Sequence, residues 1–153
     1  MGGSRWRIRT LSIYEQHAYV SSLWPSFVCR ASGGLLICIG IVQPLRVTNR
    51  YRVRIEYRST LTPKAWVEDP PLSRRDPDEP IPHTYPPDRP CLFHPRYGEW
   101  RPDMRIATTV IPWLLEWLVY YEAWQATGEW RGGGEHPLIS TSGSAARDKG
   151  DNA

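Results

Sequence analysis

The sequence predicts an α+β fold in one domain, with an N-terminal helix, a four-stranded antiparallel meander, a long proline-rich loop and C-terminal helices. Three observations predict it. Four strand-like segments follow one another with short connections between residues 27 and 68, as in a meander. Many of the 15 prolines are packed between Pro63 and Pro102, where they prevent regular helix or central strand. An apolar stripe with helical spacing begins after Pro102.

The N-terminal half supplies the first helix and the strands. The first helix is expected over about residues 11–24 and ends at Pro25. The segment 35–42 is almost continuously apolar and predicts a buried strand. Apolar and mostly charged residues alternate over 51–58, which predicts a strand with one solvated face. Shorter strands are expected over residues 27–30 and about 64–68.

The C-terminal half consists of a loop, helices and a tail. Residues 69–102 are expected to be loop, and a loop of that length is usually functional or disordered. The helical stripe that follows can be capped by Asp103, and Pro112 must kink it or divide it into two helices. The tryptophans of this stripe are interpreted as core residues, because their spacing matches helix burial. The domain is predicted to span residues 1–138, and the small, polar residues 139–153 are predicted to form a disordered tail.

Composition excludes several classes of function. The net charge of +3 is small and the arginines are spread along the chain, so no nucleic-acid partner is predicted. No apolar run is long enough to span a membrane, and residues 1–10 do not resemble a secretory signal, so a cytoplasmic location without membrane association is expected. Three cysteines without a C-x-x-C pair argue against a disulfide framework, and their thiols are expected to be reduced. No cofactor is predicted, because Gly132-Gly133-Gly134 lacks the Lys-Ser/Thr of a phosphate-binding loop.

Cys91 is the candidate nucleophile. Cys29 and Cys38 lie in apolar strand segments, where a thiol usually behaves as a small buried apolar group. Cys91 instead lies in the proline-rich loop, and neighbouring positive charge with partial exposure favours the reactive thiolate. The basic residues near Cys91 in the sequence are His83, Arg89, His94 and Arg96. The alternative on local chemistry is an incidental loop cysteine.

A zinc site is a further alternative for the same residues. Cys91 and His94 have C-x-x-H spacing, and His83 or His136 could complete a Cys/His ligand set. One close pair with distant partners is a weak signal, and histidines are more often ordinary loop residues. No metal site is therefore predicted.

The residues around Cys91 resemble those of ubiquitin-conjugating (UBC) enzymes, and so does the order of the expected elements. That family carries His-Pro-Asn, a Tyr two residues later and a catalytic Cys-Leu eight residues after the Asn. The corresponding segments here are Ile81-Pro82-His83, Tyr85, Cys91-Leu92 and, for the family's later Trp-x-Pro, Trp100-Arg101-Pro102. The resemblance implies a UBC-like fold, an active-site loop and a thioester-forming Cys91.

His83 departs from the family pattern. It replaces the Asn that helps to stabilise the oxyanion or to order the loop, and Ile81 replaces the family's His. A histidine could donate a hydrogen bond to an oxyanion, act as a general base toward an amine, or brace the loop. His83 is therefore predicted as the second catalytic residue, with these three roles open.

The C-terminal half resembles a narrower group, the prokaryotic conjugating-enzyme-like proteins of CBASS anti-phage operons. The motifs that carry this resemblance are residues 63–72 (PKAWVEDPPL), Ile111-Pro112-Trp113, Glu116-Trp117-Leu118, Tyr121-Glu122-Ala123-Trp124, Thr127-Gly128-Glu129-Trp130 and residues 132–137 (GGGEHP). The resemblance covers about residues 11–138. Some relatives are fused to an adenylating domain, and this chain is expected to be a stand-alone form.

In such operons the domain handles the C-terminal glycine of a cGAS/DncV-like nucleotidyltransferase as a conjugating enzyme handles ubiquitin. The resemblance implies an acyl transferase whose Cys91 forms a thioester with that glycine and so promotes conjugation or activation of the nucleotidyltransferase. Two alternatives stay open: a non-catalytic UBC-like module that binds a partner tail, and a cysteine hydrolase that removes conjugates with His83 as its base. A free carboxylate is a poor electrophile, so an activated acyl donor must come from elsewhere.

Overall fold

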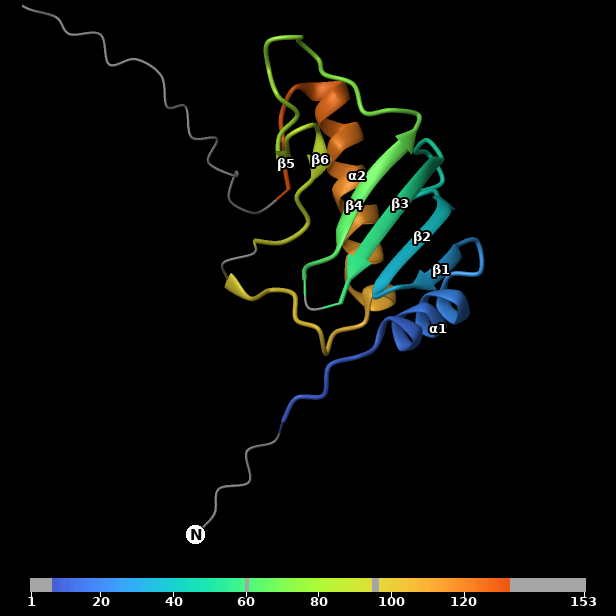
Figure 1. Cartoon of the computed structure of the whole chain (residues 1–153). Coiled ribbons are helices and arrows are strands. Elements are labelled where there is room, and N and C mark those ends of the chain that lie inside the picture. The colour runs from blue at the N-terminus through green and yellow to red at the C-terminus, as the bar shows by residue number, and fades with distance from the viewer. Residues whose placement is uncertain (1–6, 60, 95–96, 133–153) are drawn as a thin grey trace, which may run out of the picture.

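The computed structural model describes residues 7–59, 61–94 and 97–132. Helix α1 (Ile13–Leu23) is followed by four strands that form one antiparallel sheet in the order β1-β2-β3-β4. These strands are β1 (Val28–Ser32), β2 (Leu35–Val42), β3 (Tyr51–Arg58) and β4 (Lys64–Asp69). Figure 1 shows helix α2 (Val110–Thr127) behind the sheet, along one of its faces. The predicted first helix, four-stranded sheet and C-terminal helix are confirmed.

A small hairpin lies inside the region that was expected to be loop. Strands β5 (Thr84–Tyr85) and β6 (Arg89–Pro90) pair with each other, and β6 contacts β4 of the main sheet. Strands of two residues are too short to show a periodic pattern in the sequence. The hairpin therefore could be found only from its pairing in three dimensions.

The hydrophobic core lies between α2 and one face of the sheet. On β3, Tyr51, Val53, Ile55 and Tyr57 are buried, as their alternation predicts. Buried residues of α2 cover them from the other side. These α2 residues are Val110, Ile111, Leu114, Trp117, Leu118, Tyr121 and Trp124.

Strand β2 was expected to be buried, and the structure buries only one of its two faces. Leu36, Cys38 and Val42 are buried, but Ile39 is only partly covered and Ile41 is 43% exposed. A helix covers only one face of this antiparallel sheet, so the alternate side chains of β2 remain accessible even though they are apolar.

Cys29 and Cys38 form a disulfide, which corrects the expectation that no cysteine pairs. The two residues are directly opposite each other in the antiparallel register of β1 and β2. A tight turn through Gly33 and Gly34, both with positive φ, fixes that register. The number of cysteines does not show that two of them face each other across neighbouring strands, because this pairing depends on where the turn between the strands lies.

Helix α1 is tied to the segment that leads into α2. It begins with a capping box formed by Ser12 and Glu15. The buried Gln16 side chain donates to the Met104 carbonyl at 2.7 Å and accepts the Ile106 N–H at 2.9 Å. These two hydrogen bonds satisfy a buried amide and fix the approach to α2.

Helix α2 begins later than the sequence predicts. Asp103 does not cap it; its carboxylate accepts a hydrogen bond from Arg101, and a short 3₁₀ helix, η2 (Ile106–Thr108), precedes Val110. Pro112 therefore lies in the first helical turn, where its missing N–H has no helical acceptor, and neither kinks nor divides α2. Gly128, with φ 79°, ends the helix.

Within the described ranges, no helix is long and apolar enough to cross a membrane. The predicted tail of residues 139–153 and the domain boundary at residue 138 lie outside the described residues.

Candidate functional site

Cys91 directly follows the β5–β6 hairpin and is held by it. Its backbone N–H donates to the His83 carbonyl at 2.8 Å, which extends the pairing by one step. The Thr84 hydroxyl donates to the Ile81 carbonyl at 2.7 Å and fixes the start of the hairpin. The Cys91 side chain is only partly buried, and its thiol donates to the Phe93 carbonyl at 3.5 Å. The predicted nucleophile is therefore fixed in its backbone and accessible at its sulfur.

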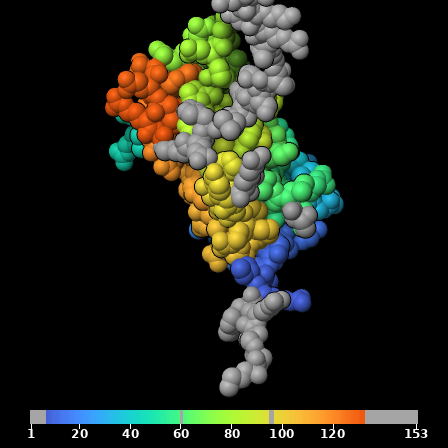
Figure 2. Space-filling view, turned by 90° about the vertical axis from the view of Figure 1, so that its left-hand side faces the viewer, coloured from blue at the N-terminus to red at the C-terminus, as the bar shows by residue number. Residues whose placement is uncertain are grey.

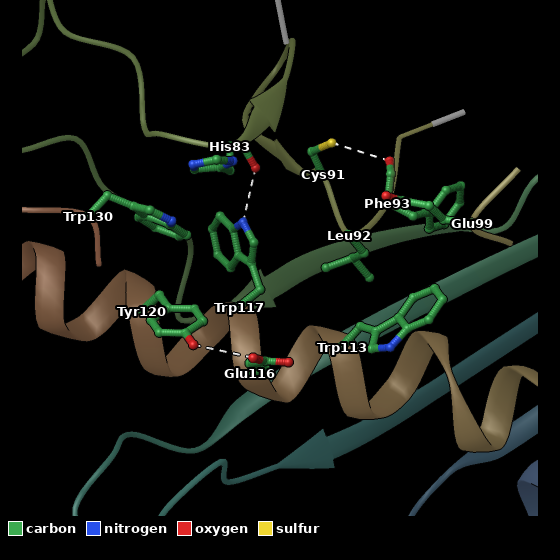
Figure 3. Close-up of a pocket in the computed structure, with 10 residues that line it drawn as sticks. All are labelled: His83, Cys91, Leu92, Phe93, Glu99, Trp113, Glu116, Trp117, Tyr120 and Trp130. Atoms are coloured by element: carbon green, nitrogen blue, oxygen red, sulfur yellow. Dashed lines mark hydrogen bonds between the residues drawn. The ribbon is translucent and has the colours of Figure 1, made fainter. Parts of the chain in front are cut away.

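His83 organises the hairpin through its backbone. Its carbonyl accepts the Cys91 N–H and also the indole N–H of Trp117, at 3.0 Å, so it joins the hairpin to α2. Its φ of 52° is left-handed, a conformation that His, Asn and Asp adopt more readily than most other residues. The imidazole is buried, with its ring centre 5.1 Å from that of Trp130. In Figure 3 the Cys91 thiol points away from this ring.

Tyr85 and Arg89 lie opposite each other on the hairpin, next to Cys91. Burial and a hydrogen bond to Cys91 raise the pKa of Tyr85 to about 12, so its phenol stays protonated at neutral pH. The Arg89 guanidinium lies 4.6 Å from the centre of the Tyr85 ring, and burial lowers the pKa of Arg89. The sulfur therefore has a hydrogen-bond donor and a cation beside it.

A cavity of about 440 Å³ opens beside Cys91, between the hairpin and α2. Figure 3 shows Trp113 on α2 below Leu92 and Phe93, and Trp117 pointing to His83. Glu116 and Tyr120 also lie on α2 and line the cavity. The other lining residues are His83, Cys91, Glu99 and Trp130. Figure 2 shows residues 91–94 and 97–100, in yellow, between α2 in orange and the sheet in green. Cys91 thus borders a groove with aromatic walls and two carboxylates.

The tryptophans of α2 have two roles. Trp117 and Trp124 are buried, as the core interpretation predicts. Trp113 is only partly buried and lines the cavity with Glu116 and Tyr120. Trp113 was assigned to the core stripe, and no site role was predicted for Glu116 or Tyr120, because the loop that faces all three is placed by long-range packing. Tyr85 had been recognised only as part of a motif, and Arg89 only as one of several nearby cations.

Of the other basic residues named with Cys91 in the sequence, the structure describes His94. The His94 ring lies 4.3 Å from the centre of the Tyr97 ring. Among the residues that the structure describes, no three His, Cys, Asp or Glu side chains are grouped as a metal site would require. Arg96 and His136 lie outside the described residues.

This arrangement can support acyl transfer through sulfur. A cysteine nucleophile needs an environment that favours the thiolate and a place for the acyl group. Tyr85 and Arg89 lie beside the sulfur, and the adjacent groove provides a place for the acyl group. The site holds Cys91 and His83 close together in the chain fold, although the imidazole is directed to Trp130 rather than to the sulfur.

Comparison with known proteins identifies the family. A family model described as type II CBASS E2 protein matches residues 16–137, which is more than half of the chain. No curated protein matches the sequence. The recognition of a CBASS conjugating-enzyme-like protein from its motifs is thereby confirmed. The family implies an E2-like role in anti-phage defence and a partner within the CBASS operon. The chain belongs to the type II CBASS E2 protein family.

Proposed function

We propose that Cys91 accepts the C-terminal glycine of a cGAS/DncV-like nucleotidyltransferase as a thioester, and that transfer from Cys91 promotes conjugation and activation of this partner. The observation that carries the proposal is the position of Cys91. Its sulfur is partly exposed, hydrogen-bonded to Tyr85, and borders the groove along α2.

The partner tail would lie in this groove, with its last residue at the sulfur. Glycine suits that position, because it has no side chain to collide with Leu92 or Phe93, which flank the thiol in the groove wall. The thiolate attacks the activated glycyl carbonyl carbon, and the sulfur–carbon bond forms as the bond to the leaving group breaks. The Tyr85 phenol, which stays protonated at neutral pH, is placed to donate a hydrogen bond during this step.

For His83 the contacts favour the bracing role among the three that its chemistry allows. Its carbonyl joins Cys91 to Trp117, and its ring packs on Trp130. A hydrolase would need this imidazole to activate water at the acyl carbon, but in Figure 3 the ring and the thiol point in different directions. We therefore assign His83 to positioning the hairpin.

A non-reducing gel tests the proposal, with the operon's nucleotidyltransferase supplied as an acyl donor activated at its C-terminal carboxyl. Wild type should form a covalent adduct that excess thiol removes, Cys91→Ala should form none, and Cys91→Ser should form an oxyester that resists thiol. A variant without Cys29 and Cys38 is the matched control and should still form the adduct. An adduct in Cys91→Ala would refute the assignment. Partner activation that survives in Cys91→Ala would instead support the non-catalytic binding module.

A further inference from the structure

Helix α2 contributes one wall of the groove beside Cys91. Trp113, Glu116, Trp117 and Tyr120 line the groove and are spaced three, one and three residues apart, so they share one side of the helix. From Trp113 to Tyr120 the helix rises by about 10 Å, which an extended peptide covers with about three residues. This wall can therefore contact the three residues that precede the terminal glycine of a partner tail.

Two carboxylates face this groove without a cation beside them. Glu116 and Glu99 line it, and among the described residues no Lys or Arg does so. Within the described ranges neither carboxylate forms an ion pair. Glu99 accepts the backbone N–H of His94 at 2.6 Å, and Glu116 accepts the hydroxyl of Tyr120 at 3.3 Å (Figure 3). Both glutamates are exposed, so they can receive a cationic group from another molecule.

The aromatic rings of the groove suit the same kind of group. The ring centre of Trp130 lies 5.5 Å from that of Trp117 and 6.1 Å from that of Tyr120. Trp113, Tyr120 and Trp130 are only partly buried and line the groove. Aromatic faces attract cations, and the methylene stems of Lys and Arg pack on apolar surface while the charge stays in water. A basic side chain thus fits both the rings and the carboxylates, whereas an acidic one would be repelled.

We propose that the groove selects a partner tail with a Lys or Arg among the three residues before its terminal glycine, and that Glu99 and Glu116 determine this preference. The inference rests on the proposed thioester function, because it specifies the tail that Cys91 accepts. The basic side chain lies along α2, with its charge at the carboxylates and its stem on the rings. The two glutamates position the tail and take no part in the bond changes at the sulfur.

Short activated peptides test this preference. Each probe is an N-acetylated tetrapeptide benzyl thioester based on Ala-Ala-Ala-Gly, with Arg, Gln or Glu in place of one alanine. Intact-mass spectrometry follows acylation of Cys91 in the full chain. At the preferred position wild type should react about threefold faster with the Arg probe than with the Gln probe, and about tenfold faster than with the Glu probe. The difference should shrink as sodium chloride is raised, because salt screens exposed charges.

Variants of the two glutamates assign the preference to them. Glu99→Gln combined with Glu116→Gln should bring the rates of the three probes within about twofold of one another. Glu116→Lys should make the Glu probe react faster than the Arg probe. Glu79→Gln is the matched control, because Glu79 is exposed and does not line the groove, and it should keep the wild-type order.

Equal rates for the three probes in wild type would overturn the preference and leave the thioester function intact. A preference that persists in the double variant would overturn the assignment to Glu99 and Glu116. If the double variant keeps the order of the probes but slows transfer of the acyl group to free lysine, the carboxylates serve the acceptor amine and their role toward the tail is refuted.

A binding measurement separates this inference from the thioester function. Failure of wild type to react with any probe would refute the thioester function. The corresponding peptide carboxamides, titrated by quenching of tryptophan fluorescence, still test the tail preference in that case. Affinity in the order Arg, Gln, Glu would support the preference, and equal affinities would overturn it.

Discussion

The hydrogen bond from Trp117 to His83 joins the β5–β6 hairpin to α2, and Trp117→Phe removes it while keeping an aromatic ring. Trp117 is 5% exposed, and its indole N–H donates to the His83 carbonyl at 3.0 Å. Loss of ring volume should cost about 1–2 kcal/mol. Loss of the hydrogen bond should add about 1 kcal/mol to this cost. The added cost is moderate because the His83 carbonyl still accepts the Cys91 N–H and is not left without a donor. The expected decrease in the free energy of unfolding is about 2–3 kcal/mol.

Trp124→Phe is the matched control. Trp124 is 4% exposed on the same helix, and its indole N–H has no acceptor among the described residues. This variant loses ring volume alone, so it should be about 1 kcal/mol more stable than Trp117→Phe, which corresponds to a melting temperature about 4 °C higher. Urea unfolding followed by far-ultraviolet circular dichroism measures both variants.

Hydrogen exchange gives a local readout of the same change. The Cys91 amide donates to the carbonyl that Trp117 supports, so Trp117→Phe should speed exchange at Cys91 by about fivefold relative to Trp124→Phe. If the two variants are equally stable and exchange Cys91 at equal rates, the hydrogen bond does not hold the hairpin and this reasoning is refuted.

Three further predictions concern the site and the framework. The pKa of Tyr85 is raised to about 12. Subtracting the absorbance titration of Tyr85→Phe from that of wild type should therefore show one phenol that ionises near pH 12. The stability that the protonated Tyr85 phenol contributes is present below about pH 10 and is lost as the pH rises toward 12. A Tyr85 transition near pH 10 would contradict this. Gly128→Ala should cost about 1 kcal/mol in thermal unfolding, because φ is 79° there, while Gly128→Asn should cost less; equal costs would argue against the left-handed cap. Replacing Cys29 and Cys38 by Ala should lower the free energy of unfolding by about 2–3 kcal/mol and preserve acylation of Cys91, whereas unchanged stability under oxidising conditions would count against the disulfide.

Local patterns in the sequence predict the main elements well. Alternation over β3 and the helical stripe of α2 depend only on neighbouring residues, and the structure places both where the patterns indicate. The predicted start of α2 was wrong. A proline is tolerated in the first helical turn, and the apolar stripe alone does not show where that turn begins. The Cys29–Cys38 disulfide was missed for a similar reason: it depends on strand register rather than on cysteine count.

The candidate site was predictable only in part. Motif spacing around Cys91 predicted it as the nucleophile, which stays a prediction, and indicated His83 and Tyr85 as its neighbours, which the hairpin places beside it. The groove wall formed by Trp113, Glu116 and Tyr120 was not predictable, because it exists only once the loop packs against α2. The environment of Arg89 likewise depends on Trp66, which lies 23 positions earlier in the sequence, on β4.

Mass-spectrometric localisation of the acyl group tests the central claim most directly. Wild type would react with an activated C-terminal peptide of the nucleotidyltransferase and then be digested without reductant, which preserves both a thioester and the Cys29–Cys38 disulfide. The thioester proposal predicts one added acyl group, on the peptide that contains Cys91, which hydroxylamine releases and Cys91→Ala lacks. An acyl group found on another residue, or retained in Cys91→Ala, would contradict it.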